Sequence, residues 1–92
     1  MEKRFLVWHE EHHSFFLLGY LLPLKPKEQQ ILRILIEEEG ASMETILEKS
    51  AVPLNQRRIP DYVFSINEKA IQISGRRLIQ FEGGRYRVIA AM

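Results

Sequence analysis

Residues 59–88 read IPDYVFSINEKAIQISGRRLIQFEGGRYRV and decide the fold, because two hydrophobic periods follow one another in this stretch. In its first half, apolar residues return every three or four positions and so share one helical face: Val63, Ile66, Ala70 and Ile73. We expect Phe64 and Ile71 to widen that face. Pro60 suits a first helical turn, and Gly75 can take the positive φ that ends a helix. The spacing therefore predicts a helix over about residues 60–74.

From residue 79 onward, the hydrophobic period changes to two. Apolar and aromatic residues alternate with polar ones on both sides of Gly83-Gly84. Two glycines between alternating runs are a strong hairpin signal, since a type I′ turn needs positive φ at both positions. A turn centred there is expected to pair three sets of residues across the strands: Glu82 with Arg85, Phe81 with Tyr86, and Ile79 with Val88.

The remainder of the chain supplies strands and then helices. We expect strands at residues 5–8, 14–18 and 21–24, with a turn at 19–20. The strand that holds Pro23 should lie at an edge or be very short. A helix should begin at Pro26, with a core stripe of Ile31, Leu32, Leu35 and Ile36. Ser42 can cap a second helix over residues 43–48, and a polar loop at 50–58 leads into the third helix. This order predicts an α+β fold with three antiparallel strands, three helices and a C-terminal hairpin.

Length and composition limit the possible classes of protein. The chain has 92 residues, of which 46% are hydrophobic and 27% charged, and it contains no cysteine. This suits one small globular domain spanning residues 1–92, and it excludes a disulfide framework or a thiolate metal site. The longest apolar run, residues 15–24, is interrupted and falls well short of the ~20 residues that a membrane helix needs. We expect no membrane association and a cytoplasmic location.

Charge is distributed unevenly along the chain. Residues 57–92 carry seven basic and three acidic residues, a net charge of +4, whereas residues 1–56 carry six basic and nine acidic residues, a net charge of −3. Six of the seven cations in the C-terminal part are arginines. Such asymmetry suggests a side that faces a polyanion, although chance clustering in a small domain is the competing explanation.

The letters His9-Glu10-Glu11-His12-His13 match the H-E-x-x-H pattern of zinc proteases. That chemistry requires a helix, because only there does the i, i+4 spacing bring two imidazoles to one metal. The flanking residues lack a helical period and no third ligand follows, so we expect an exposed loop between two strands. No catalytic set can be named elsewhere. The sequence predicts a non-enzymatic protein without a cofactor or a metal site, with adventitious metal binding by the three histidines left open.

Two blocks of sequence resemble a known family. Residues 24–32, LKPKEQQIL, resemble the L-T-x-K-E-x-x-L-L opening of OmpR/PhoB-type winged-helix domains, the DNA-binding effector domains of bacterial response regulators. Residues 78–88, LIQFEGGRYRV, look like the wing of that family, which runs I-x-T-V-R-G-x-G-Y-R-L. Val63, Ile66 and Ala70 stand where the family has the apolar residues of its recognition helix.

This resemblance implies a winged helix-turn-helix and a role in transcription regulation. The N-terminal strands would occupy residues 1–24, the three-helix core 25–75 and the wing 76–92. The third helix would enter the major groove of double-stranded DNA, and the wing would touch the backbone or minor groove. The residues that we expect to contact DNA are Arg57, Arg58, Ser65, Glu68, Lys69, Gln72, Arg76, Arg77, Arg85 and Arg87.

The sequence departs from the family pattern on the helix that should read DNA. Ser65 and Asn67 stand where the family usually has arginine, and Glu68 where it often has lysine. On a helical wheel, Asp61, Ser65, Glu68 and Gln72 form the strip opposite the apolar face, with Lys69 at its margin. The arginines on either side would therefore have to supply the affinity, and contacts from about six of them would give a salt slope of roughly −5.

Other functions and partners remain open. The acidic strip and the apolar run at residues 15–22 also suit a winged helix used for protein contact, including homodimerisation or binding of a regulatory protein. The family's effector domains normally follow a receiver domain, which this sequence lacks, so the chain would act alone, be a fragment or be controlled by a partner. Arg57 and Arg58 could simply solvate a loop, while Arg85 and Arg87 could pair across the hairpin with Glu82 and Gln80.

Overall fold

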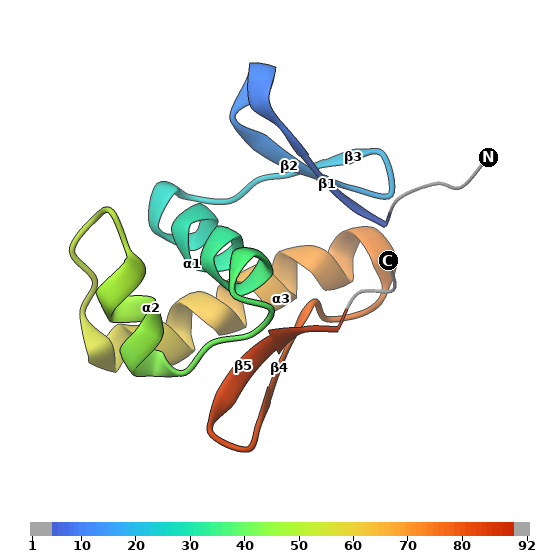
Figure 1. Cartoon of the computed structure of the whole chain (residues 1–92). Coiled ribbons are helices and arrows are strands. Elements are labelled where there is room, and N and C mark those ends of the chain that lie inside the picture. Colours follow the sequence, from blue (N-terminus) through green and yellow to red (C-terminus); the bar gives the residue numbers. More distant parts are fainter. Residues whose placement is uncertain (1–4, 90–92) are drawn as a thin grey trace.

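The computed structural model describes residues 5–89, so the outermost parts of the predicted N-terminal and wing regions, 1–4 and 90–92, lie outside the described residues. Three helices lie between two small antiparallel sheets (Figure 1). The strands and helices are, in order, β1 (Leu6–His9), β2 (Ser14–Leu17), β3 (Tyr20–Leu22), α1 (Pro26–Glu37), α2 (Met43–Lys49), α3 (Ile59–Ser74), β4 (Ile79–Glu82) and β5 (Arg85–Val88). This is the predicted α+β order. In residues 5–89, none of the helices combines the length and apolar character needed to cross a bilayer.

The N-terminal sheet has the order β1-β2-β3, with Trp8 opposite Phe15 and Phe15 opposite Leu22. The turn after β2 lies one residue earlier than expected, at Leu18 and Gly19, which both have positive φ. The third strand therefore begins at Tyr20 and ends before Pro23, instead of covering residues 21–24. The edge position that the proline predicted is confirmed, since β3 pairs with β2 alone among the described strands.

Helix α1 occupies the centre of the molecule (Figure 1). Its first turn is closed by Glu28, whose carboxylate accepts a hydrogen bond from the Lys25 N–H at 2.8 Å. Ile31, Leu32 and Leu35 are buried as expected, but Ile36 is 37% exposed and Ile34 is buried instead. The predicted stripe was thus wrong at one position, because α1 has neighbours on several sides and buries a wider face than one stripe.

Helices α2 and α3 begin and end close to the predicted positions. The Ser42 hydroxyl accepts a hydrogen bond from the Thr45 N–H at 3.2 Å and caps α2. Helix α3 has Pro60 in its first turn and ends at Gly75, whose φ is 77°. Of the expected apolar face, Val63, Ile66 and Ala70 are buried, together with Ile59 at the start of the helix, whereas Ile73 is only partly buried.

The expectation that Phe64 and Ile71 belong to that buried face was wrong. Their side chains are 66% and 43% exposed, respectively. Each follows a buried residue directly, Val63 or Ala70, and one residue step turns about 100° around a helix. The inward face of α3 is narrow enough that this step carries both side chains into solvent.

The C-terminal hairpin has the predicted register. Ile79 pairs with Val88, Phe81 with Tyr86, and Glu82 with Arg85. Gly83 and Gly84 both have positive φ, 60° and 79°, as the turn between the strands requires. The hairpin is attached to the connection between α1 and α2 by two backbone hydrogen bonds between Ala41 and Tyr86, of 2.9 and 2.8 Å. The hairpin, the helices and the first sheet share one hydrophobic core.

Candidate nucleic-acid interface

The outward face of α3 carries a stripe of exposed side chains at spacings of three and four residues. We call this the outward stripe, and it consists of Asp61, Phe64, Glu68, Ile71 and Gln72. Two of its members are large apolar residues, two are acidic and one is an amide. Lysine and arginine are absent from the stripe itself.

Asn67 lies beside the stripe but points toward the hairpin. Its Oδ1 accepts hydrogen bonds from the N–H groups of Leu78 and Ile79, at 2.9 and 2.8 Å, and its Nδ2 donates to the Ile79 carbonyl at 3.0 Å. Since Leu78 and Ile79 are buried, these three bonds satisfy backbone groups that water cannot reach. Asn67, at a position where the sequence resemblance places an arginine, thus fastens the start of β4 to α3.

Lys69 is also turned inward, toward the first turn of α1. Its Nζ donates to the Glu28 carboxylate at 2.7 Å, and the Glu28 side chain is almost completely buried. Burial alone would raise the pKa of Glu28, but hydrogen bonds from Lys69, Ser65 and the Lys25 N–H, together with the Lys69 charge, hold that pKa below its ordinary value. Ser65 and Lys69 thus serve the contact between α3 and α1, and the structure separates them from the outward Glu68 and Gln72.

Four of the expected arginines lie at the two ends of α3. Arg57 and Arg58 precede its first residue, and Arg76 and Arg77 follow Gly75; all four are exposed. The 16 residues of α3 separate the two pairs, which corresponds to about 24 Å at ~1.5 Å per residue. Arg58 makes a surface ion pair with Asp61 at 3.4 Å and lies near the Tyr62 ring.

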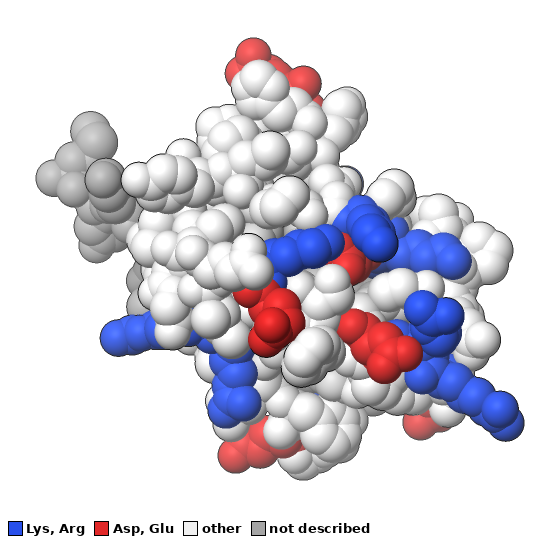
Figure 2. Space-filling view, turned by 180° about the vertical axis from the view of Figure 1, so that it is seen from behind, with Lys and Arg blue, Asp and Glu red and all other residues white. Residues whose placement is uncertain are grey.

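Figure 2 shows the molecule from behind, the side on which α3 lies in Figure 1. Lysine and arginine side chains lie toward both margins of this view and also across its middle, where acidic side chains lie among them. The exposed residues Lys25 and Lys27 at the start of α1 add to the cations near the Glu28–Lys69 contact. Sequence reasoning missed these two lysines, because only the tertiary contact between α1 and α3 brings that first turn to this side.

The two wing arginines point elsewhere. The Arg85 guanidinium donates to the Gly40 carbonyl at 2.8 Å, beyond the end of α1. Arg87 packs over Gly40 and pairs with Glu82 of the opposite strand at 3.4 Å. Both side chains therefore lie on the face of the hairpin that meets α1, and the structure does not bring them together with the arginines at the ends of α3.

A groove of about 370 Å³ separates α3 from the hairpin. Its lining is largely apolar and includes Pro60, Phe64, Phe81 and Tyr86, with Arg77 at its edge. Phe64 and Phe81 remain 66% and 59% exposed. The sequence predicts Phe64 on the buried face of the helix, and for Phe81 it predicts only the pairing with Tyr86 across the hairpin. Periodicity alone does not show where a hairpin extends past its supporting helix.

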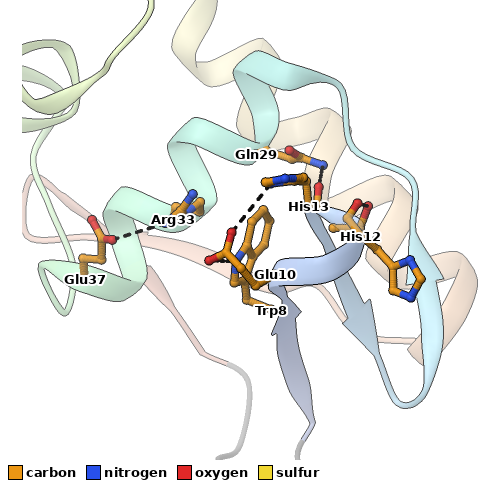
Figure 3. Close-up of polar contacts among 8 residues, drawn as sticks. Trp8, Glu10, His12, His13, Gln29, Arg33 and Glu37 are labelled. Atoms are coloured by element: carbon orange, nitrogen blue, oxygen red, sulfur yellow. Dashed lines mark hydrogen bonds and ion pairs between the residues drawn. The ribbon is translucent and has the colours of Figure 1, made fainter.

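The histidine-rich segment forms an exposed turn between β1 and β2, as expected (Figure 3). His9 ends a strand, residues Glu10–His12 form a single 3₁₀ turn, and His13 has a φ of 48°, so the two outer histidines do not share an α-helix. Gln29 of α1 donates to the His13 carbonyl at 3.1 Å and holds the turn in place. Within residues 5–89, three or more metal-ligating side chains do not converge anywhere.

Trp8 next to this turn is structural. Its ring is partly buried against Phe15, at 4.9 Å between centroids, and the Arg33 guanidinium lies 4.6 Å above it (Figure 3). Arg33 also approaches Glu37 at 3.9 Å. These contacts fasten the N-terminal sheet to α1.

Comparison with solved structures finds the same arrangement in the DNA-binding domain of the response regulator AdeR, whose crystal structure contains an intercistronic region. The match has a TM-score of 0.72 and 18% sequence identity, and it covers 96% of this chain and 97% of that domain. The fold of this chain is therefore a winged helix. The OmpR/PhoB-like resemblance of the sequence is thereby confirmed at the level of the fold. Neither a protein-family model nor a curated protein matches the sequence.

Proposed function

We propose that this chain binds double-stranded DNA and acts in transcription regulation, with α3 as the element that enters the major groove. The observation that supports this best is the pair of exposed arginines at each end of α3, on either side of an outward stripe that no other element within residues 5–89 covers. The structural likeness to a DNA-binding winged-helix domain supports the same function.

The dimensions of α3 suit this role. A helix with its side chains is about 10–12 Å across and fits a major groove about 12 Å wide. Arginines at both ends of the helix would then reach phosphates that border the groove and set the position of the protein, while the outward stripe would face base edges. In this proposal, Arg57, Arg58, Arg76 and Arg77 contact phosphates.

The remaining candidates have different roles in the proposed interface. Glu68 and Gln72 face the bases, whereas Ser65 and Lys69 are left out because their polar groups are directed to Glu28. Arg85 and Arg87 add only long-range positive charge, since their guanidinium groups are directed to Gly40 and Glu82. No enzymatic role is proposed.

Titration of the protein with random-sequence duplex DNA at several salt concentrations tests the proposal. Four phosphate contacts predict that log K falls with log[salt] at a slope of about −3.6, compared with roughly −5 if all six arginines contact phosphate. A slope near the first value supports the four-arginine interface. Absence of binding to any duplex at ~50 mM salt, where electrostatic affinity is strong, would refute DNA binding.

A protein-contact function is the alternative, and exposed apolar side chains favour it. Tyr20 and Leu21 of β3 are 67% and 52% exposed, next to Leu18 in the preceding turn. Such a cluster on an edge strand is suited to contact with another protein, including a second copy of the chain. Sedimentation velocity distinguishes the two functions. Self-association that depends on protein concentration, together with an absence of duplex binding, would favour protein contact over DNA binding.

A further inference from the structure

The side chains of the outward stripe differ from the arginine side chains that most often contact guanine in DNA-binding proteins. Lys69 is the single lysine of α3, and the helix contains no arginine. Because Lys69 is directed to Glu28, the exposed side of the helix presents acceptors, an amide and apolar groups. The bidentate contact of arginine or lysine with guanine is therefore not available to this stripe.

On this basis, and on condition that the chain binds DNA as proposed above, we infer that α3 reads pyrimidines. Glu68 accepts a hydrogen bond from the amino group of a cytosine, and the exposed Phe64 ring packs on the methyl group of a thymine. Both contacts are chemically specific, since a carboxylate matches the N4 donor of cytosine and an apolar side chain matches the C5 methyl of thymine.

Glu68 is suited to this role by its lack of other partners. The carboxylate makes no hydrogen bond or ion pair with residues in the range 5–89, whereas Asp61, the other acid of the stripe, is paired with Arg58 at 3.4 Å. Asp61 thus has its charge partly offset at the end of the helix. Glu68 lies in the middle of α3, where the helix would approach the base pairs most closely.

Phe64 lies one helical turn from Glu68 on the same face, so the two contacts fall along one line. Four residues correspond to about 6 Å along the helix axis. Two base-pair steps correspond to about 6.8 Å along a DNA strand. The thymine and the cytosine should therefore lie within about two steps of one another. Phe64 also borders the groove toward Phe81, which leaves its ring open on the outer side.

The experiment begins with selection of preferred sequences from a random duplex pool at ~50 mM salt. In the selected duplex, each thymine is then replaced by deoxyuridine, which lacks the methyl group. Wild-type affinity should fall about fourfold at one position, the value expected for one buried methyl-sized group. The Phe64→Ala variant should bind the thymine and deoxyuridine duplexes equally. Equal binding of both duplexes by the wild-type protein would overturn the assignment of Phe64.

Two further measurements test Glu68. Glu68→Ala, which removes the acceptor oxygens, should reduce discrimination for cytosine at the selected position by at least about fivefold, the low end of the effect of a mismatched pair. Replacing the guanine opposite that cytosine by 7-deazaguanine, which lacks the N7 acceptor, should leave wild-type affinity unchanged. A strong loss with 7-deazaguanine would show that a hydrogen-bond donor reads the guanine instead, and unchanged discrimination in Glu68→Ala would show that Glu68 does not read the cytosine.

Glu11→Ala is the matched control, because it removes the same side chain from the exposed turn between β1 and β2. It should preserve both the thymine and the cytosine preference. The measurement on deoxyuridine duplexes uses the wild-type protein, so it remains informative even if a variant fails to fold. Failure of DNA binding itself is seen earlier, as absence of any selected duplex, and is thus distinct from failure of this inference.

Discussion

The inward and outward faces of α3 both carry polar side chains, but the two faces differ in whether these side chains have hydrogen-bond partners. Asn67 and Lys69 on the inner side find partners in β4 and α1, at distances of 2.7–3.0 Å. Glu68 and Gln72 on the outer side have side chains without hydrogen-bond partners in the part of the chain that the structure describes. Some polar residues of one helix therefore join it to neighbouring elements, whereas others remain free to contact a ligand.

The largest effect is expected for Asn67→Ala. The change removes three hydrogen bonds and leaves the buried N–H groups of Leu78 and Ile79 without acceptors. We expect a loss of about 4 kcal/mol in the free energy of unfolding, since each unsatisfied buried group costs ~1–3 kcal/mol. Urea denaturation measures it. Asn55→Ala, at an exposed cap of a 3₁₀ turn, is the control and should cost roughly 1 kcal/mol. Equal losses in the two variants would contradict a special role for Asn67.

Lys69→Met should have the second-largest effect. We expect a loss of about 3 kcal/mol in the free energy of unfolding at pH 7, because the change leaves the buried Glu28 carboxylate without its cation. The loss should shrink toward pH 4. In the wild-type protein the folded pKa of Glu28 lies below its ordinary value of 4.5, so its contribution is present above that pH and disappears as pH falls through the folded pKa. Without Lys69, two of the causes that lower the folded pKa of Glu28 are removed, so this pKa rises relative to the wild-type protein and protonation relieves the penalty at a higher pH.

Denaturation of both proteins at pH 7 and pH 4 measures this dependence. Glu28→Gln in the Lys69→Met background serves as the control, because it removes the titrating group and should make the difference between the two pH values small. A loss for Lys69→Met that is the same at both pH values would show that the ion pair is not its cause.

A smaller effect, on DNA affinity alone, separates the arginines at the ends of α3 from those of the wing. The double change Arg57→Gln and Arg76→Gln should lower the steepness of the salt slope by about 1.8, since each lost phosphate contact accounts for ~0.9. Arg85→Gln with Arg87→Gln removes the same charge and should change the slope little. Salt titrations with one duplex compare the two variants, and equal changes in slope would place the wing arginines on DNA as well.

The smallest effect on stability is expected on the outward stripe. Glu68→Gln and Gln72→Ala should change the free energy of unfolding by no more than about 0.5 kcal/mol, as is usual for exposed positions without partners. Thermal or urea denaturation measures this. A loss of more than 1 kcal/mol in either variant would mean that the outer face of α3 is covered by part of the molecule and is not available to a ligand.

Local patterns predicted most elements, for reasons that particular residues show. Gly83-Gly84 within an alternating run predicts one hairpin register, because a shift by one residue would send Ile79, Phe81, Tyr86 and Val88 to the other face. Pro60 and Gly75 predict where the third helix begins and ends, because proline suits a first helical turn and glycine can take the positive φ that ends a helix. The turn after β2 was misplaced by one residue, since Leu18 at a positive φ gives no signal in the sequence.

The candidate site was less predictable. A helical wheel placed Ser65 and Lys69 toward DNA and Phe64 in the core, because it treats every polar residue as outward and every apolar one as inward. Glu28, 41 positions before Lys69, attracts that ammonium inward. Arg85 is likewise directed to the Gly40 carbonyl, 45 positions earlier in the chain.

The sequence by itself determined the order, limits and pairing of the helices and hairpin, because these depend on periodicity and on the backbone preferences of proline and glycine. Only the tertiary structure decided which polar and aromatic side chains of α3 are free. That choice depends on hydrogen bonds and packing between elements far apart in the chain, whose energies no local pattern encodes.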